Sequence, residues 1–384
     1  MVLEAPAGYG KTTLLASMAQ EWSRFSGPGV ATLAWYSLEA PDSDPATFLE
    51  GLVLSIRRRV PQFGAVTLAA LRGAADPRDR IDSLMAVLRE DLAGSAGGPI
   101  FLILDDFQWL SDRVLLNALE RQILGSESPL HLIISSRSAS PFYLAGLRSK
   151  EQVEELDAER LRFTPEEVRE LILQRSGSQV PHGLIDEVVR ETGGWPAAAN
   201  LASLLIARNG GRLPFQRLAP TEHGYGMLVS GLLGGVPVHH RELVARTSLL
   251  HFVDEDGCRE GVGVMEPADV LRWLEAENLP ATRFEGGNGT LRYEPLFHSF
   301  LRKELALLLL PQERRDLLQR AASYHAKQGD WDHALNCLLE ADLEHEAAAL
   351  VEHAAEAEMA LGHLDTVLRW IHTLPGRVRR VHPR

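Results

Sequence analysis

Residues 5–13, Ala-Pro-Ala-Gly-Tyr-Gly-Lys-Thr-Thr, combine glycines, a lysine and two threonines in one short segment. In the pattern G-x-x-x-x-G-K-[ST], glycines free successive backbone N–H groups to wrap a phosphate at the start of a helix. Ala5 replaces the first glycine of that pattern, and it is small enough for the same turn. The segment therefore predicts a phosphate-binding loop for a purine nucleoside triphosphate, with ATP as the expected ligand. An ordinary glycine-rich turn is the alternative.

Within this loop, two side chains have distinct expected roles. Lys11 supplies a point charge between the β- and γ-phosphates, and the hydroxyl of Thr12 is a ligand for Mg²⁺. The residues expected to contact the bound nucleotide are consecutive: Ala7, Gly8, Tyr9, Gly10, Lys11, Thr12 and Thr13.

A hydrophobic run from Phe101 to Leu104 ends in two acids, Asp105 and Asp106. Beside a phosphate-binding loop, the first acid of such a pair holds the Mg²⁺ shell, so Asp105 is the expected second metal-binding residue. Asp106 lies where a water-activating acid is expected, although aspartate is shorter than the glutamate of vigorous ATPases. Two acids at the end of a strand can also cap a helix, which is the alternative interpretation.

Two further residues could contact the nucleotide. Arg137 follows the next apolar strand, and ligands of open α/β sheets bind at the carboxyl ends of strands. It could sense the γ-phosphate and stabilise its developing charge, or it could be a surface arginine paired with a carboxylate. Within residues 193–196, Gly-Gly-Trp-Pro, Pro196 could lie against an adenine ring, or the segment could be a helix break with a packed indole.

The composition disfavours several classes of protein. The chain has 384 residues and a net charge of −13, a sign that repels nucleic-acid backbones. The basic runs 57–59 and 377–380 are interpreted as solvated surface, with a local basic patch as the alternative. Cys258 and Cys337 have no metal-ligand spacing. With no apolar run long enough to span a bilayer and no signal-peptide pattern, we expect a cytoplasmic protein without membrane contact.

Near-continuous apolar strands alternate with helical patterns over the first part of the chain. Such strands are buried on both faces, which indicates a parallel sheet between layers of helices. We predict a three-layer α/β fold, with strands at 30–38, 99–106 and 130–137 and helices at 14–25, 45–59 and 81–92.

The strand signal fades after residue 160, and helices predominate. Thr164-Pro-Glu-Glu predicts a capped helix start, and 281–293 predicts a hairpin that turns at 286–289. The turns at Gly329 and Gly362, 33 residues apart, suggest tetratricopeptide-like helical hairpins. We therefore predict an α/β P-loop NTPase core at 1–160, a helical lid domain at 161–212, a winged-helix domain at 213–308 and an incomplete α-solenoid at 309–384.

Jointly, these motifs resemble the MalT-like branch of the STAND NTPases, the large LuxR-type ATP-binding transcriptional regulators. The resemblance covers almost the whole chain and rests on residues 5–13, 34–39, 44–45, 104–107, 134–137, 161–167, 192–197, 245–250, 293–302 and 324–334.

The resemblance implies a switch driven by ATP, ADP and Mg²⁺. In the family the resting state is a closed form with bound ADP. Inducer and ATP open this form, and the open form self-associates to activate transcription. Slow ATP hydrolysis returns the protein to the resting state. By position, Lys11, Thr12 and Asp105 match phosphate and Mg²⁺ ligands, Arg137 matches the sensor and Pro196 matches the adenine contact. The helical repeats would receive an unknown inducer or regulatory protein.

Three features depart from the family pattern. Glu294 replaces a histidine that often holds the ADP β-phosphate, and the nearby His298 lies on another helix face. Residues 1–4 look like the second half of the first core strand, so we expect a truncated start. The DNA-binding helix-turn-helix is absent from this chain, so DNA contact is expected only through that missing domain.

Two other functions remain open. The loop could hold ADP structurally in a non-catalytic scaffold that binds a protein or small inducer through its repeats. A metabolic P-loop kinase is a weaker alternative, because a kinase has no evident use for the long helical extension. The inducer and the target genes cannot be inferred from the residues.

Overall fold

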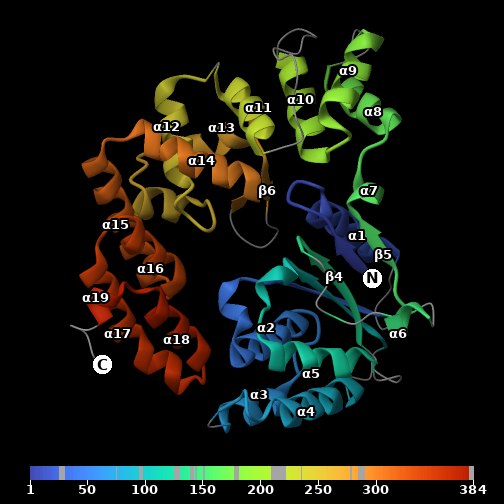
Figure 1. Ribbon diagram of the computed structural model, residues 1–384, viewed down its shortest axis with the longest axis vertical. Helices are drawn as coiled ribbons and strands as arrows, with labels where there is room; N and C mark the ends of the chain where they lie inside the picture. Colours follow the sequence, from blue (N-terminus) through green and yellow to red (C-terminus); the bar gives the residue numbers. More distant parts are fainter. Residues whose placement is uncertain are drawn as a thin grey trace. The chain divides into compact units, whose positions relative to one another are not determined.

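The computed structural model describes residues 1–25, 31–74, 76–94, 98–124, 130–138, 142, 145–149, 152–176, 181–208, 222–234, 236–276, 279–283 and 290–379 (Figure 1). These residues form two compact units. The first unit consists of Met1–Pro6, Gly10–Leu161 and His353–Thr373; the second consists of Ala7–Tyr9, Arg162–Glu352 and Leu374–Arg384. Within the phosphate-loop segment the chain therefore passes from the first unit to the second and back, because only Ala7–Tyr9 belongs to the second unit.

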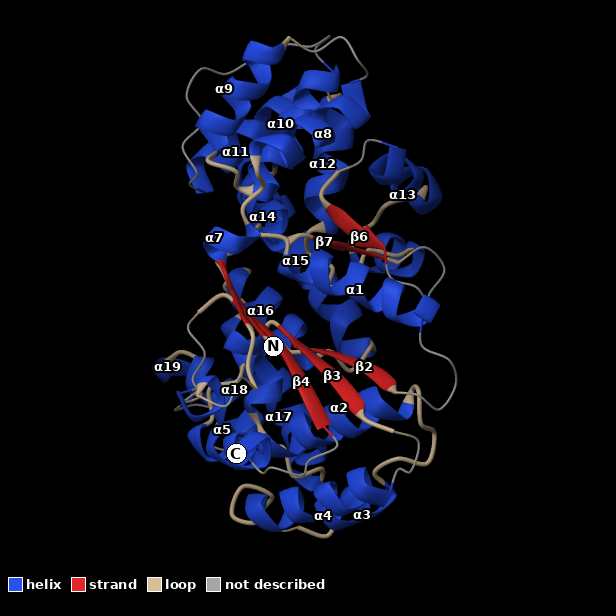
Figure 2. Cartoon of the chain, turned by 90° about the vertical axis from the view of Figure 1, so that its right-hand side faces the viewer, coloured by secondary structure: helices blue, strands red, loops and turns tan. Residues whose placement is uncertain are grey.

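The first unit is built on a sheet of five parallel strands in the order β2-β3-β4-β1-β5, part of which is seen in Figure 2. The strands are β1 Val2–Glu4, β2 Thr32–Ser37, β3 Ile100–Asp105, β4 Leu130–Ser136 and β5 Glu155–Asp157. Because β4 lies between β1 and β3, the strand that precedes the phosphate loop is not adjacent to the strand that ends in the two acids.

Helices cover both faces of this sheet, which confirms the predicted three-layer fold. On one face, Leu15 packs with Leu3 and Ile103. On the other face, residues of four helices form one core with Val2 and Leu102. These helices are α1 Lys11–Phe25 on the first face, and α2 Pro45–Arg57, α3 Ala65–Arg72, α4 Ile81–Gly94 and α5 Arg113–Leu124 on the second. Neighbouring strand residues thus face opposite helical layers, as the pleat requires.

Some boundaries differ from the prediction. Helix α1 begins at Lys11 rather than Leu14, because the end of the phosphate loop is itself the first helical turn, where Leu14 N donates to Gly10 O at 2.8 Å. Helix α3 was not predicted; it is short, and its N-cap Gly64 has a left-handed φ of 67°. Val30, the predicted start of the second strand, lies outside the described residues.

Shorter elements complete the first unit before its last segment: the 3₁₀ turns η1 Ala40–Ser43 and η2 Phe107–Trp109, and the helices α6 Ala145–Arg148 and α7 Ala158–Leu161. The last segment brings helix α18, Leu364–Thr373, into this unit although it is distant in sequence.

The second unit is mainly helical. Its first helices are α8 Pro165–Ser176, α9 His182–Thr192 and α10 Pro196–Arg208. Helix α8 begins as predicted: Thr164 Oγ1 accepts from Glu167 N at 3.2 Å, and Glu167 Oε2 accepts from Thr164 N at 2.7 Å. This reciprocal pair is a capping box, which satisfies two backbone donors that a helix start leaves open.

A winged-helix region follows. Its elements are α11 Glu222–Gly234, α12 Val238–Thr247, the π-helical turn η3 Gly257–Gly261, α13 Pro267–Ala276, β6 Ala281–Arg283, β7 Leu291–Tyr293 and α14 Pro295–Leu308. Strands β6 and β7 pair antiparallel, so the predicted hairpin is confirmed. Its predicted turn at 286–289 lies outside the described residues.

The C-terminal part contains two successive pairs of helices and a short final helix. The helices are α15 Pro311–Lys327, α16 Trp331–Glu340, α17 Glu344–Ala360, the already named α18, and the short α19 Gly376–Arg379. Gly329 and Gly362 lie in the turns within the two pairs with φ values of 75° and 87°. This left-handed geometry, which favours glycine, confirms the two predicted turns as equivalent. Among the described helices, none combines the length and apolar character that crossing a membrane requires.

Candidate nucleotide-binding site

The candidate site lies at the carboxyl edge of the parallel sheet in the first unit. Strands β1, β3 and β4 end at Glu4, Asp105 and Ser136, and parallel strands end at the same edge. The chemistry-bearing residues that follow each strand therefore meet there. In the first unit the structure brings together Lys11, Thr12, Asp105, Asp106 and Arg137, all of which were selected from sequence.

Lys11 is buried, and its ammonium binds the turn that precedes it. Its Nζ donates to Ala5 O at 2.6 Å and to Pro6 O at 3.1 Å. Burial and the nearby Arg137 lower the pKa of Lys11 to about 8, while Asp106 and Asp105 partly oppose this change. The ammonium is thus held by two backbone carbonyls.

Asp105 is fixed by three donors. Thr12 Oγ1 donates to Asp105 Oδ2 at 2.9 Å, Asp106 N donates to Oδ1 at 3.1 Å, and Ser135 Oγ also donates to Oδ1. Burial raises the pKa of Asp105, and the hydrogen bonds from Ser135 and Thr12 oppose that rise. Neighbouring hydroxyl and carboxylate oxygens are the hard ligands that Mg²⁺ prefers, so Thr12 and Asp105 fit this ion.

Asp106 and Arg137 form a second cluster with Gln108. Arg137 Nη2 lies 3.3 Å from Asp106 Oδ1, and Gln108 Nε2 donates to the same oxygen at 2.8 Å. The backbone N–H of Arg137 donates to Gln108 Oε1 at 3.0 Å. Asp106 itself has a left-handed φ of 57°, a backbone strain that concentrates at functional sites. Arg137 does pair with a carboxylate, as the alternative interpretation expected, but the partner is the candidate water-activating acid.

Two contributors were not recognised as site residues from sequence. Ser135 was noted only as part of the strand end, yet its hydroxyl bonds Asp105. Gln108 lies in the η2 turn directly after the two acids and bridges the side chain of Asp106 to the backbone of Arg137. One feature of the sequence indicates that Gln108 belongs to the site, namely a polar residue two positions after the acid pair.

The loop residues Ala7, Gly8 and Tyr9 belong to the second unit, as does Pro196. Ala197 N donates to Gly8 O at 2.9 Å, and Trp195 Nε1 lies 3.3 Å from Ala7 O. Pro196 is the first residue of α10 and is buried there. Gly8 has a φ of 79°, and a Cβ at this position would lie 2.8 Å from the side chains of Ala197 and Trp195. The indole is packed, as the helix-break interpretation expected, and it packs on the phosphate-loop segment.

Within the same unit, the Arg162 guanidinium lies 5.9 Å from the ring centroid of Tyr9, which is a cation–π distance. Nucleotide contact stays a prediction for every loop residue named from the sequence and for Pro196.

Glu294 stands where the family often has a histidine, and His298 lies nearby in sequence. The two side chains have different surroundings in the second unit. Glu294 is the N-cap residue of α14, and burial raises the pKa of its carboxyl. His298 Nε2 donates to Ser248 O at 2.8 Å, and burial lowers the pKa of its ring. His298 thus has a structural partner within the winged-helix region.

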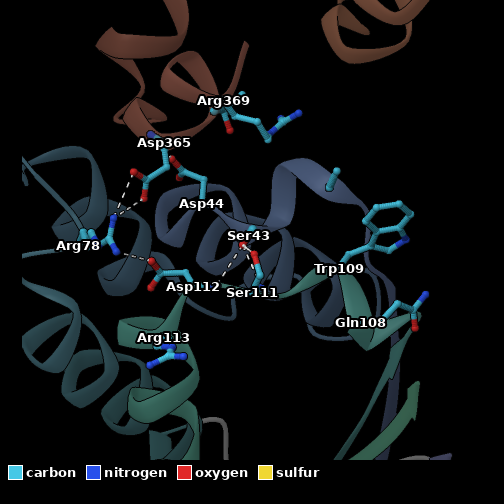
Figure 3. A pocket seen from close by; sticks show the side chains of 12 residues that line it. Ser43, Asp44, Arg78, Gln108, Trp109, Ser111, Asp112, Arg113, Asp365 and Arg369 are labelled. Atoms are coloured by element: carbon cyan, nitrogen blue, oxygen red, sulfur yellow. Dashed lines mark hydrogen bonds and ion pairs between the residues drawn. The ribbon is translucent and has the colours of Figure 1, made fainter. Parts of the chain in front are cut away.

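A cavity of about 560 Å³ lies in the first unit (Figure 3). Arg78 pairs with Asp112 at 2.7 Å and with Asp365 of α18 at 3.3 Å. Asp365 N donates to Asp44 Oδ2 at 3.0 Å. Gln108 lines this cavity as well as contacting Asp106, so the two features share one side chain.

Comparisons with known proteins agree with this geometry. A model of the AAA domain matches residues 1–140, and a model of the MalT winged helix domain matches residues 229–323. In these two regions the chain is therefore similar to AAA domains and to the winged helix of MalT regulators. It is 28% identical over 334 residues to the HTH-type transcriptional regulator MalT of Cronobacter sakazakii, covering 85% of this chain and 36% of that protein.

A second MalT regulator, from Klebsiella pneumoniae, is 26% identical over 307 residues, covering 79% of this chain and 33% of the relative. The chain thus spans about a third of the length of these relatives. Its fold is similar to a STAND protein with a tetratricopeptide repeat sensor from Pyrococcus horikoshii. That similarity has a TM-score of 0.53 and 17% identity, covering 99% of this chain and 62% of that one.

Proposed function

We propose that this chain is the nucleotide switch of a MalT-type transcriptional regulator. It binds ATP with Mg²⁺, hydrolyses it slowly, self-associates in the ATP form and rests in the ADP form. The observation that supports this best is the hydrogen-bonded chain at the sheet edge. Thr12 binds Asp105, the next residue Asp106 binds Arg137, and Gln108 binds both members of that pair.

In this proposal the first cluster holds the metal. Thr12 and Asp105 would bind Mg²⁺, which when bound neutralises charge on the β- and γ-phosphates. Ser135 keeps the Asp105 carboxylate oriented through its hydrogen bond. Lys11 would exchange the carbonyls of Ala5 and Pro6 for phosphate oxygens.

The second cluster, Asp106, Gln108 and Arg137, would contact the γ-phosphate and take part in its hydrolysis. Arg137 would leave the carboxylate of Asp106 for the γ-phosphate, and Asp106 would then accept a proton from the attacking water. Asp106 Oδ1 is also held by Gln108 and is on a short side chain, so it is a poorly placed base. This restraint supports a slow timer rather than a high-turnover enzyme.

The other partners follow from the family. Pro196 would contact adenine. Its position supports this role, because its neighbours Trp195 and Ala197 are both hydrogen-bonded to the phosphate-loop segment. The helical hairpins would receive an inducer or regulatory protein. DNA would be bound only through a helix-turn-helix domain. We propose that the protein acts in the cytoplasm.

The test is self-association measured by size-exclusion chromatography with light scattering, in ATP and in ADP. The wild type should assemble in ATP alone, and Lys11→Ala should stay monomeric because it loses the phosphate contact. Asp106→Asn should keep ATP binding and assembly while its single-turnover hydrolysis falls about 100-fold, the usual contribution of a general base.

The alternative is the non-catalytic, ADP-loaded scaffold. The packed contacts of Trp195 and Ala197 with the phosphate-loop segment favour a structural role for bound nucleotide. If purified protein keeps one ADP that never exchanges, and Lys11→Ala alters stability without altering assembly, the switch proposal is wrong and the scaffold is supported.

A further inference from the structure

Three metal-binding side chains lie together in the second unit, well away in sequence from the nucleotide motifs. They are His251, just after α12, and Asp330 and His333 at the start of α16. One donor atom of each residue lies within 4.8 Å of the others, and all three side chains are partly exposed. Two imidazoles and a carboxylate from two chain segments therefore converge on one point.

The spacing of these donors is close to that of a coordination sphere. His333 Nδ1 lies 2.8 Å from Asp330 Oδ1, and the ring centroids of His251 and His333 are 4.6 Å apart at an angle of 67°. Nitrogen and oxygen ligands about 2 Å from a tetrahedral Zn²⁺ lie roughly 3–4 Å from each other. Small side-chain rotations would bring the three donors to that spacing.

A fourth residue orients the carboxylate from outside the trio. His325 is buried, and its Nδ1 lies 3.0 Å from Asp330 Oδ2. Its Nε2 donates to Leu249 O at 2.9 Å, two residues before His251 and 76 residues away in the chain. Outer partners of this kind hold ligands in place at metal sites.

We propose that His251, Asp330 and His333 bind one transition-metal ion of the Zn²⁺ class, with water in the remaining position. Two imidazole nitrogens favour zinc, cobalt or nickel over Mg²⁺ and Ca²⁺, which prefer oxygen ligands. The ion would fasten the segment after α12 to the α15–α16 helical hairpin. The site is independent of the proposed nucleotide switch and would bind its metal without nucleotide.

The test uses the full chain, freed of metal by a chelator and kept without nucleotide and Mg²⁺. Titration with Co²⁺ should give visible d–d absorption that saturates at one equivalent, and Zn²⁺ should abolish it by competition. His251→Ala and His333→Ala should each weaken Co²⁺ binding at least tenfold. His325→Gln should weaken it about 10- to 100-fold, the usual cost of losing an outer partner.

The matched control is His372→Ala, which removes an exposed histidine of α18 outside the cluster. It should keep wild-type Co²⁺ affinity. Thermal unfolding provides a second measurement: Zn²⁺ should raise the midpoint of the wild type and of the control but not of the ligand variants, because a ligand of the folded state stabilises it by mass action. Circular dichroism verifies that each variant is folded.

The proposal fails if the wild type shows no stoichiometric Co²⁺ absorption. It also fails if His251→Ala and His333→Ala both keep wild-type affinity, since the metal then binds elsewhere. If His333→Ala does not fold, His251→Ala and the Zn²⁺ effect on the wild-type midpoint still decide the question. None of these outcomes depends on ATP binding, so a failure here leaves the proposed switch untouched.

Discussion

At the scale of single residues, the protonation of Lys11 should make the affinity for nucleotide depend on pH. Its pKa is lowered to about 8 by burial and by Arg137, and phosphate binding favours the charged form. We therefore predict that ATP affinity is constant below that pKa and weakens above it, by up to about tenfold per pH unit. Fluorescent-nucleotide titration between about pH 7 and 9.5, a range that spans the pKa of Lys11, measures the effect.

Lys11→Arg is the control for this prediction. Arginine stays charged throughout the range, so its affinity, although weaker overall, should not change with pH. A wild-type affinity that is equally flat would contradict the assigned pKa.

At Glu294, burial of a carboxyl affects the stability of the fold rather than nucleotide binding. Its pKa is raised by burial, so the folded state binds its proton more tightly than the unfolded chain does. The folded state therefore favours the protonated carboxyl more than the unfolded chain does, and stability is lost as pH rises from the unfolded pKa through the folded pKa of Glu294. We predict that Glu294→Gln unfolds at a higher temperature than the wild type at neutral pH.

This difference should shrink toward about pH 4, where the carboxyl of the wild type is also neutral. Circular dichroism melts of the full chain at several pH values measure it. Glu266→Gln, at an exposed position, is the matched control and should leave the midpoint unchanged. A Glu294→Gln midpoint at or below that of the wild type at neutral pH would show that burial is not what dominates at this residue.

At the scale of elements, the start of α10 packs on the phosphate-loop segment within the second unit. A Cβ on Gly8 would lie 2.8 Å from the side chains of Ala197 and Trp195 and 2.9 Å from Leu296 Cδ1, at a φ of 79°. We predict that Gly8→Ala costs about 1–3 kcal/mol of stability through overpacking and backbone strain. It should also weaken ATP binding, because the loop must shift.

Denaturant unfolding and nucleotide titration measure the two effects. Gly183→Ala is the matched control, because a Cβ there meets no atom within 4 Å and alanine favours a helix. It should be neutral or slightly stabilising. Equal effects of the two substitutions would rule out the close approach at Gly8 as the cause.

At the scale of the whole molecule, Arg78 holds α18 within the first unit. It connects Asp112, whose side chain is 8% exposed, to Asp365, which is 287 residues away from Arg78 in the chain. Arg78 is 44% exposed, so solvent weakens the pair, and we expect Arg78→Ala to cost about 1 kcal/mol. Hydrogen exchange of the α18 amides should become roughly fivefold faster.

Arg121→Ala tests whether any lost ion pair has this effect. Arg121 pairs with Asp82, and their side chains are 58% and 75% exposed. Exchange in α18 should not change in this variant. Unchanged exchange in Arg78→Ala as well would mean that the helix is held by other contacts.

The sequence by itself determined the features that depend on neighbouring residues. The phosphate loop, the acids at the end of β3, the capping box at Thr164 and the glycine turns at 329 and 362 are local patterns. Each rests on hydrogen bonds or backbone geometry within a few residues, so residue type and spacing suffice to find them. The alternation of buried strands and helices likewise predicted the three-layer sheet.

Only the tertiary structure decided which distant side chains meet. The insertion of β4 between β1 and β3 brings Ser135 to Asp105, and the turn after β3 brings Gln108 to Arg137. The approach of His251 to Asp330 has the same origin in long-range packing. Strand order and helix packing carry no periodic signal in the residues themselves, because they depend on how whole faces bury against one another.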